Sequence, residues 1–445
     1  MPPSPSRLSP PRVPPSPPPA LWALQDCSCF YCSCERLFRP DLRDKPVVAL
    51  SNNDGRVIAI TPEAKELGFR RGDVYFKREK DFRAAGVAVF SSNYALYGDI
   101  SRRVARAMES VVPEVYPYSI DEAFIPFDRA MAARAEEIGW ALHDRVAKWV
   151  GAPTRVGIGP TRTLAKLANH WSKKISRVLA LELGSPLLEE LLAKTALSDV
   201  WGIGRRQAEK LRQRGLSDAR DLRDLDPSVA RALLTVVGER TVMELRGHQC
   251  VVGDLSPVPR QSMVSSRSLG TRVHDEETLA QALCARVTSA AQRLRAEGLL
   301  ALGLSVFIET GNYAENPFHA GATVTLPSPT NSTLALFKAA RAALATAFKP
   351  GHAYRKVGIA LHELASEEES LQSNPLFAIG AENDPPAVSA PLMGALDRIN
   401  RKHGAGAIRV SSGGPREPYW ATRATRLSPV STTAWDLLPV ARARG

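Results

Sequence analysis

Two adjacent carboxylates, Asp121 and Glu122, lie inside an apolar, strand-like stretch at residues 118–124 (YSIDEAF). A buried ionised carboxylate is costly unless it is paired with a cation or bound to a metal. Neighbouring side chains on a regular strand point to opposite faces, so both acids can serve one site only at a strand end or a bulge. The stretch therefore predicts a cation site at such a position. The alternative is a solvated Asp-Glu turn between strands.

A third carboxylate is expected from a second strand. Asp26 closes the apolar run 21–24 and is followed by the aromatic pair Phe30 and Tyr31. Hard divalent cations such as Mg²⁺ bind carboxylate oxygens together with substrate phosphates. Acids on two strands therefore favour two-metal phosphoryl transfer.

Composition limits the partner and the number of domains. A chain of 445 residues is long enough for several domains. The formal net charge of +12 favours a polyanionic partner, either nucleic acid or an acidic membrane surface. No apolar run reaches the ~18 residues that a membrane span needs. We therefore expect no membrane-spanning segment.

Four of the six cysteines crowd together at Cys27, Cys29, Cys32 and Cys34, a spacing that a structural zinc site could use. We expect Cys27 and Cys29 on the strand of Asp26, and Cys32 and Cys34 on the following helical turn, which makes a closed tetrahedron awkward. Burial of the thiols as small apolar groups is the favoured interpretation. So few cysteines in a long chain do not resemble a secreted disulfide framework, and we expect a reducing cytosol.

Hydrophobic periodicity predicts an α+β multidomain protein. Around the acidic stretch the expected element order is β-α-β-β-α-β, the split βαβ arrangement, and a second such pattern follows later. Between them lies a helix-rich segment with a Gly-Ile-Gly turn at residues 202–204. The expected divisions are a Pro/Ser-rich disordered extension (1–20), a first α/β domain (21–182), the helix-rich segment (183–250), a linker (251–261), a second α/β domain (262–364) and a tail (365–445).

Two helices are predicted with their ends. Thr61 is expected to cap a short helix that starts at Pro62 and stops at Gly68. The second runs over residues 163–174. The Gly-x-Gly at residues 157–159 is weak evidence for phosphate binding, and no Gly-Lys-Ser/Thr follows it.

Taken in order and spacing, several segments resemble the Y-family DNA polymerases, and most closely their UmuC branch, over almost the whole chain. The segments that carry this resemblance are 30–35 (FYCSCE), 38–42 (FRPDL), 45–48 (KPVV), 51–55 (SNNDG), 90–94 (FSSNY), 118–124, 163–170 (TLAKLANH) and 200–206 (VWGIGRR). The resemblance implies a right-hand-like polymerase with a ferredoxin-like palm, small fingers inserted at about 36–86, a helical thumb with a helix-hairpin-helix, and a β-α-β-β-α-β little finger.

The resemblance also implies roles for individual residues. It makes Asp26, Asp121 and Glu122 the ligands of two Mg²⁺ ions, together with the backbone carbonyl of Cys27. Tyr31 stands at the steric gate that excludes a 2′-hydroxyl. Phe30 beside it is a second candidate for substrate binding, although core packing would explain Phe30 equally well. Lys65 and Lys173 would contact the incoming triphosphate, although a surface lysine and a cationic helix end are the ordinary meanings of such residues.

DNA contacts are implied in the thumb and the little finger. Backbone N–H groups at Gly202 and Gly204 would approach phosphates, and Arg205 and Arg206 add charge there. In the little finger, Ser265, Arg267 and Arg355 are the candidates for the template backbone. Each charged residue here could instead be an ordinary solvated side chain.

The tail implies partners. Residues 371–377 (LQSNPLF) resemble a sliding-clamp peptide, with Gln372, Leu376 and Phe377 as its contacts. Residues 393–400, Trp420 and 427–429 resemble the end of UmuC proteins. Such polymerases act with a UmuD′ dimer, a RecA-type recombinase filament and the sliding clamp, in the cytoplasm at the nucleoid.

The expected function is error-prone translesion DNA synthesis from deoxynucleoside triphosphates on a primer–template, within an SOS-type response to DNA damage. Two alternatives stay open from the sequence. One is a catalytically weak DNA-binding homologue that acts through partners, and the other is a different palm-bearing enzyme such as a nucleotidyl cyclase, because a palm alone does not fix function.

Overall fold

The computed structural model describes residues 18–250, 260–311, 314, 316–366, 386–404, 406–415, 418–429 and 432. These residues divide into two compact units. The first holds the described residues of 1–51, 56–257 and 426–445, and the second those of 52–55 and 258–425. Most of the predicted N-terminal extension and linker, and all of the predicted clamp peptide, lie outside the described residues. No helix in the described part is long and apolar enough to cross a membrane.

The central sheet of the first unit has the strand order β5-β6-β1-β7-β8. β1 pairs antiparallel with both β6 and β7, whereas β7 and β8 run parallel. The strands are β1 (Leu21–Cys27), β5 (Tyr116–Pro117), β6 (Glu122–Phe127), β7 (Thr154–Gly159) and β8 (Val178–Ala180). The predicted β-α-β-β-α-β order is present, and the short strand β8 extends it.

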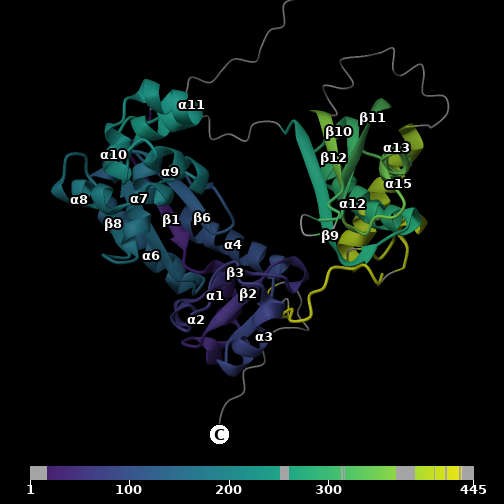
Figure 1. Ribbon diagram of the computed structural model, residues 1–445, viewed down its shortest axis with the longest axis horizontal. Coiled ribbons are helices and arrows are strands. Elements are labelled where there is room, and N and C mark those ends of the chain that lie inside the picture. Colours follow the sequence, from purple (N-terminus) through teal and green to yellow (C-terminus); the bar gives the residue numbers. More distant parts are fainter. Residues whose placement is uncertain are drawn as a thin grey trace, which may run out of the picture. The chain divides into compact units, whose positions relative to one another are not determined.

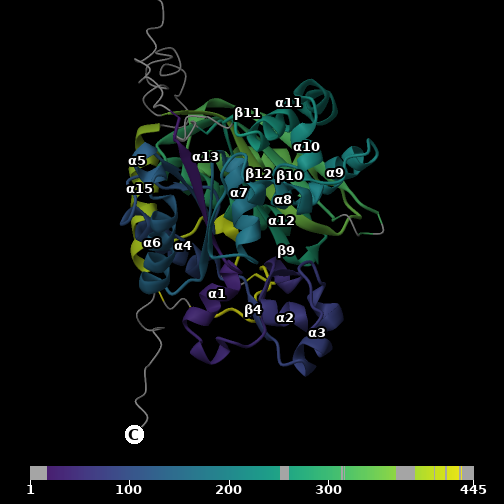
Figure 2. The same cartoon turned by 90° about the vertical axis from the view of Figure 1, so that its left-hand side faces the viewer.

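Helices cover both faces of this sheet (Figures 1 and 2). Side chains of β1 alternate between the faces. Ala23 and Cys27 belong to the core formed with α4 (Tyr94–Glu109) and α6 (Ala135–Trp149). Trp22 and Leu24 pack on the other face, with Ala165 of α7 (Arg162–Ser172). Asp26 therefore lies on the α7 face. The short helix α5 (Arg129–Ala132) follows β6.

Close packing of α7 on β7 explains the Gly-x-Gly at residues 157–159. A Cβ atom on Gly157 would lie 2.1 Å from the backbone nitrogen of Asn169. A Cβ on Gly159 would lie 2.9 Å from the nitrogen of Ala165. Both contacts are with helix backbone, which cannot give way, so these glycines serve helix–strand packing.

The predicted fingers contain a three-stranded sheet, β3-β2-β4, with helices around it (Figures 1 and 2). Thr61 precedes the short helix as predicted, and Gly68 beyond its end has φ +84°. The Thr61 hydroxyl accepts from Val47 N at 3.1 Å and does not cap the helix. The elements are α1 (Phe30–Leu37), η1 (Pro40–Leu42), β2 (Val47–Leu50), β3 (Val57–Ile60), α2 (Pro62–Glu66), α3 (Tyr75–Ala84) and β4 (Ala88–Ser91).

The placement predicted for Cys29 is wrong. β1 ends at Cys27 and α1 starts at Phe30, so the chain turns within two residues. Cys29 makes this turn in the left-handed conformation, with φ 48°. Cys27 and Cys34 are buried in the core beneath α4, whereas Cys32 is buried in a separate cluster with Val47.

The helix-rich segment is built around its own apolar core. Its helices are α8 (Pro186–Lys194), η3 (Leu197–Asp199), α9 (Arg205–Arg212), α10 (Ala219–Asp224) and α11 (Pro227–Leu245). Leu191 and Leu192 of α8 and Leu211 of α9 meet Leu234 of α11 in this core. Side-chain caps begin α8, α10 and α11, at Ser185, Asp218 and Asp226 respectively.

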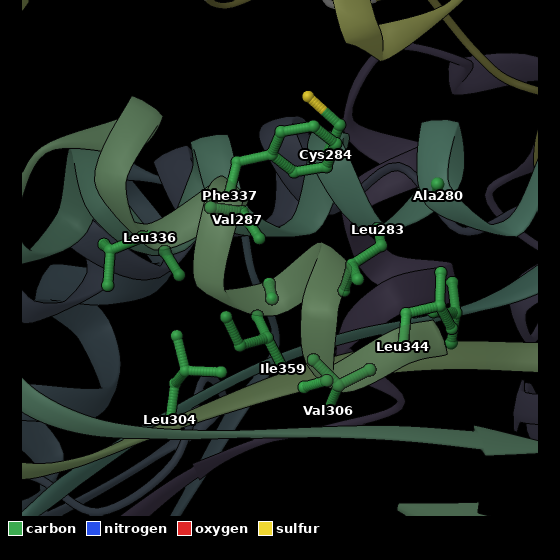
Figure 3. Packing of buried hydrophobic residues seen from close by; sticks show 14 of the residues in the cluster. Ala280, Leu283, Cys284, Val287, Leu304, Val306, Leu336, Phe337, Leu344 and Ile359 are labelled. Atoms are coloured by element: carbon green, nitrogen blue, oxygen red, sulfur yellow. The ribbon is translucent and has the colours of Figure 1, made fainter. Parts of the chain in front are cut away.

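The second unit contains the sheet β11-β10-β12-β9, and all adjacent strands are antiparallel. Helices α12 and α13 lie against one face of it (Figure 1). Leu304, Val306 and Ile359 of the sheet point toward helix residues such as Leu283 and Leu344 (Figure 3). The elements are η2 (Asn52–Asp54), β9 (Ser262–Val273), α12 (Glu276–Ala296), β10 (Leu299–Glu309), β11 (His319–Thr330), α13 (Thr333–Ala347) and β12 (Tyr354–Ser366). The predicted second β-α-β-β-α-β pattern is confirmed.

C-terminal elements pack on this second unit. They are α15 (Pro386–His403) and η4 (Ser411–Gly413). Asp397 of α15 accepts from Arg295 of α12 at 2.7 and 2.9 Å, and the same guanidinium donates to Asn331 O at 2.7 Å. Val410 and Trp420 pack against the core of the unit. The segment that resembles the end of UmuC proteins is therefore partly integrated into this domain.

Candidate active site

The three candidate acids lie at one end of the central sheet. Asp26 stands directly opposite Glu122 in the antiparallel pair of β1 and β6, so their side chains share the α7 face. β6 begins at Glu122, and Asp121 therefore precedes the strand. The Cys27 amide donates to the Asp121 carbonyl at 2.9 Å. Asp121 and Glu122 are therefore at a strand end. A strand end or a bulge is where neighbouring side chains can reach the same site.

Two of the acids already have cationic partners. Arg155 of β7, directly opposite Asp26, donates to the Asp26 carboxylate. Lys166 of α7 donates to Glu122 Oε2 at 2.9 Å. The side chains of Asp26 and Glu122 are 14% and 24% exposed, so each ion pair is largely shielded from water. Asp121 instead accepts from the Ser119 hydroxyl at 2.6 Å.

Burial and neighbouring charge act on Asp26 in opposite directions. Burial raises the pKa of its carboxyl group, and the Arg155 guanidinium works against this rise. The carboxylates of Glu122 and Asp121 raise the pKa further. The net result is a raised pKa, for which burial is the largest cause and repulsion from the two neighbouring carboxylates a smaller one.

A pocket of about 250 Å³ opens beside these acids within the first unit. α7 contributes one wall, and the loop before α9 contributes another. Its polar and aromatic lining comprises Asp26, Glu122, Thr163, Lys166, Asn169, His170, Lys173, Asp199 and Trp201. The pocket therefore combines acids from the sheet with two lysines from one helix face.

The described residues contain no group of three metal-ligating side chains that is already assembled. The ion pairs explain this, because Arg155 and Lys166 hold two of the carboxylates. The donor set nevertheless fits magnesium, since three carboxylates and a nearby backbone carbonyl supply the hard oxygen ligands that this ion takes. A metal ion at this site would compete with Arg155 and Lys166 for the carboxylates of Asp26 and Glu122.

Tyr31 belongs to a group of packed aromatic rings that it forms with Tyr97 and Tyr94. Its ring lies 4.5 Å from that of Tyr97, with an angle of 13° between the planes. Tyr94 contacts it edge-on, with ring centroids 6.0 Å apart. Tyr31 is partly exposed, whereas Phe30 is buried in the core beneath α4. Phe30 is thus a core residue in this structure, and Tyr31 is the ring that a bound molecule can reach.

The two candidate triphosphate lysines lie on different helices of the first unit. Lys173 caps the C-terminus of α7 and Lys65 is exposed on α2. The pKa of Lys173 is lowered because protein atoms displace water around its ammonium group and because the Arg155 guanidinium repels it. Lys65 adds to this repulsion, while Asp26 opposes it. Positive charge therefore gathers beside the acids.

The Gly-Ile-Gly turn of the helix-rich segment has the conformation that its glycines predict. Gly202 has φ +87°, and Gly204 is the N-cap residue of α9. Gly204 N donates to Gln207 Oε1 at 2.9 Å, so this amide already has a partner. Arg205 and Arg206 are exposed at the first turn of α9.

The little-finger candidates lie on β9 and β12. Ser265 is only 8% exposed, opposite Ile359 of the helix-covered face. Arg267 is exposed, and its Nε donates to Thr422 Oγ1 at 2.6 Å. Arg355 is exposed. Arg267 and Arg355 are therefore accessible to a phosphate, whereas Ser265 offers little surface.

Sequence reasoning missed Arg155 and Lys166 as members of the site. Lys166 precedes Lys173 by seven residues, and this spacing places both on one face of a helix. That periodicity could have identified Lys166. Arg155 depends on the register between β1 and β7, for which the sequence gives no local signal.

Family models match most of the chain. The impB/mucB/samB family matches residues 25–170, and its C-terminal domain matches residues 260–374. An HHH motif of the same family matches residues 188–216, and a domain of unknown function (DUF4113) matches residues 390–441.

Individual relatives extend these matches. Protein UmuC of Salmonella typhimurium is 41% identical over 427 residues, covering 94% of this chain and 100% of the relative. Protein ImpB of Salmonella typhimurium is 38% identical, covering 95% and 100%. Among solved structures, a Y-family DNA polymerase chimera built from Dbh and Dpo4 superposes with a TM-score of 0.64 at 16% identity, covering 78% of this chain and 99% of that one.

The fold is thus that of a right-hand Y-family DNA polymerase with a helix-hairpin-helix motif. The chain belongs to the impB/mucB/samB family, the UmuC-type branch of the Y-family polymerases. It is accordingly an error-prone translesion DNA polymerase, and DNA and nucleotides are its substrates. Family membership decides against the nucleotidyl-cyclase alternative.

Proposed function

We propose that Asp26, Asp121 and Glu122 form the catalytic centre that joins a deoxynucleotide to a primer 3′-oxygen with release of pyrophosphate. The observation that carries this proposal is the pairing of Asp26 with Glu122 across β1 and β6, next to Asp121 at the strand end. The backbone carbonyl of Cys27 completes the set of oxygen ligands. Y-family polymerases depend on metal ions, and two Mg²⁺ ions are the cofactors that this donor set suits.

Asp26, Asp121 and Glu122 would hold the metal ions, whose chemistry would be to activate the primer oxygen and to stabilise negative charge on the transferring phosphorus. The protein must first release the carboxylates for this role. Arg155 and Lys166 hold Asp26 and Glu122 in place before substrate arrives. If metal ions took over these carboxylates, both cations would become available to offset the negative charge of the incoming phosphates. Arg155 and Lys166 would thus pair with the carboxylates in the free enzyme and with the phosphates in the nucleotide complex.

Lys173 and Lys65 are the proposed contacts of the triphosphate. The charge of Lys65 lowers the pKa of Lys173, so the two ammonium groups are close enough to repel each other. An anion that binds between them relieves this repulsion, so triphosphate binding is favoured before any contact with the base. Tyr31 is the proposed steric gate, because its ring is flat, partly exposed and supported from behind by Tyr97.

The thumb and the little finger are proposed to hold primer–template DNA. Arg205 and Arg206 lie beside the Gly202–Gly204 turn, where exposed positive charge meets backbone amides. Arg267 and Arg355 are the exposed cations of the little finger at the predicted positions. Contacts of this kind position the duplex and do not read its sequence. Loss of one cation is expected to weaken binding to all sequences and to reduce the salt dependence.

Partners and cellular role belong to the proposal as well. The relatives named UmuC and ImpB favour a role in an SOS-type response, with a UmuD′ dimer and a RecA-type filament as partners. The sliding clamp is the proposed partner of Gln372, Leu376 and Phe377. The place of action is the cytoplasm, at the nucleoid.

Primer extension with Mg²⁺ on damaged and undamaged templates tests the catalytic proposal. The purified chain, with UmuD′ and clamp added, is expected to extend primers past a lesion and to lose this activity on chelation of the metal. Failure to extend any template under these conditions would contradict it.

The clamp contact needs a separate test. The double variant with Leu376→Ala and Phe377→Ala is expected to lose stimulation by the clamp while keeping its clamp-independent extension, because short apolar anchors supply most of the energy in such peptide contacts. A double variant that still responds to the clamp like the natural chain would remove the clamp from the list of partners.

A further inference from the structure

Glu35 of α1 is a buried carboxylate that the catalytic proposal does not use. It is 2% exposed, and the Tyr97 hydroxyl donates to its Oε1 at 2.7 Å. The Ser428 side chain also acts on this carboxyl group as a hydrogen-bonding neighbour that lowers its pKa. No ion pair with Glu35 is formed within the described ranges. A buried carboxylate without a cation depends on such donors, so each hydroxyl matters for its position.

Tyr97 connects this carboxylate with the proposed steric gate. Its side chain is fully buried, and its ring stacks on that of Tyr31 at 4.5 Å. Packed rings in such a stack constrain one another's plane. The orientation of the Tyr31 ring therefore depends on where the hydrogen bond to Glu35 holds Tyr97.

Ser428 is held from the other side by Asn93, the N-cap residue of α4. The Asn93 side-chain amide donates to the Ser428 carbonyl at 3.0 Å and to its hydroxyl oxygen at 3.1 Å. Asn93 is itself 2% exposed, and its Oδ1 accepts from Leu96 N at 3.2 Å. A hydroxyl that accepts from Asn93 is left with its proton free to donate to Glu35.

Arg426 anchors the same segment two residues earlier. Its backbone nitrogen donates to Ser91 Oγ, and its carbonyl accepts from Ser91 N, both at 3.0 Å. Its guanidinium pairs with Glu79 of α3 at 2.9 Å and lies 5.3 Å from the Tyr75 ring centroid. Four elements of the fingers and palm, α1, α3, β4 and α4, therefore hold residues 426–428 in place.

We propose that Ser428 is a positioning residue for sugar selection, acting through Glu35 and Tyr97. Its hydroxyl fixes the carboxylate of Glu35, which in turn fixes the ring of Tyr97. Tyr97 sets the plane of Tyr31, against which the sugar of the incoming nucleotide packs. The inference rests on the proposed role of Tyr31 as the steric gate. It assigns a task to a residue within the match to a domain of unknown function.

Loss of the Ser428 hydroxyl leaves the buried carboxylate with one donor in place of two. The carboxylate then turns toward any remaining partner, and the Tyr97 hydroxyl follows it. The gate ring loses its fixed plane while the metal-binding acids stay unchanged. Sugar discrimination should therefore suffer more than deoxynucleotide incorporation.

The test measures kcat/KM for a ribonucleotide and for the matching deoxynucleotide by primer extension. Ser428→Ala is expected to lower the discrimination ratio about three- to tenfold, the effect of losing one hydrogen bond of ordinary strength. Ser428→Thr keeps the hydroxyl and is expected to keep the ratio. Leu427→Ala is the matched control, because this neighbouring side chain is 51% exposed.

Two further variants test whether Ser428 acts through Tyr97 and Tyr31. In Tyr97→Phe, which keeps the stacked ring but loses the hydroxyl, Ser428→Ala should add no further loss. Tyr31→Ala alone should lower discrimination strongly. If it does so while Ser428→Ala leaves the ratio unchanged, the gate stands and the role of Ser428 is overturned. If Tyr31→Ala leaves discrimination unchanged, the gate assignment itself fails, and this inference fails with it.

Discussion

Asp26 and Glu122 face each other across the antiparallel pair of β1 and β6, and each is bound to a cation from a different element. Arg155 comes from the strand on the other side of β1, and Lys166 comes from α7. The acids are therefore neutralised separately before metal and nucleotide arrive.

Asp121→Asn and Glu122→Gln should each abolish primer extension while sparing DNA binding. Both substitutions keep the shape of the side chain and remove a negative charge that the proposed metal ions need. A loss of about 10²-fold or more in kcat is expected, as for other groups that stabilise charge in a transition state.

Extension rates and DNA-binding anisotropy should be measured together. Asp128→Asn, at the other end of β6, is the control, because asparagine also caps a helix. Near-normal extension by either acid variant would remove that acid from the site.

Arg155→Met should make the stability of the protein more dependent on Mg²⁺. Without the guanidinium, the charge of Asp26 near Glu122 and Asp121 is no longer offset, at an expected cost of about 1–3 kcal/mol in unfolding free energy. Mg²⁺ can offset these charges, so the metal should raise the stability of the variant more than that of the natural chain.

Chemical denaturation with Mg²⁺ and with chelator measures this difference. Arg103→Met removes an arginine whose side chain is 53% exposed and leaves Asp99 its ion pair with Arg102, so it should show no such dependence. An equal response in both variants would argue against metal binding beside Asp26.

Glu35→Gln should alter the pH dependence of stability. Burial raises the pKa of the Glu35 carboxyl above its ordinary value of 4.5, and the hydroxyls of Tyr97 and Ser428 oppose this rise. Between 4.5 and the raised pKa, the folded chain therefore holds a proton that the unfolded chain has released. Stability of the natural chain falls as pH rises through this window, and the glutamine variant lacks this fall.

The measurement is the unfolding free energy of both proteins from pH 4 to pH 8. The stability of Glu35→Gln relative to the natural chain should increase above pH 4.5 and then level off. Glu137→Gln provides the contrast, because the pKa of that exposed carboxyl is lowered by Arg134, so its difference should be flat above pH 4.5. A flat difference for Glu35→Gln as well would show that burial does not control this carboxyl.

Asp397→Asn should loosen α15 from the second unit. The substitution removes the charge that Arg295 pairs with, although the guanidinium keeps its bond to Asn331 O. A cost of about 1–3 kcal/mol is expected for this largely buried pair. Hydrogen exchange in α15 should rise more than exchange in α12. Glu277→Gln, in an exposed pair with Arg341, should have little effect. Unchanged exchange in α15 would show that other contacts hold the helix.

Much of this architecture was predictable because its signals are local. Alternation and helical periodicity predicted both β-α-β-β-α-β patterns, and the Asp121-Glu122 pair predicted a strand end or a bulge, of which the structure has the strand end. Features that depend on register or on distant segments were not predictable. The partner of Asp26 is set by how β1 pairs with β7. Cys29, which was expected on the strand, lies instead in the two-residue connection between β1 and α1. The link between Glu35 and Ser428 joins residues from opposite parts of the sequence, which no local pattern reveals.

The contact between Asn93 and Ser428 spans 335 positions of the chain. Closing so long a loop costs entropy, and contacts of this kind form late in folding. During synthesis, N-terminal domains fold first, so the central sheet and its acids can be complete while the segment that carries Ser428 is still being made. If Ser428 sets the gate as proposed, a newly made molecule acquires the ability to copy before it acquires its full selectivity for deoxyribose.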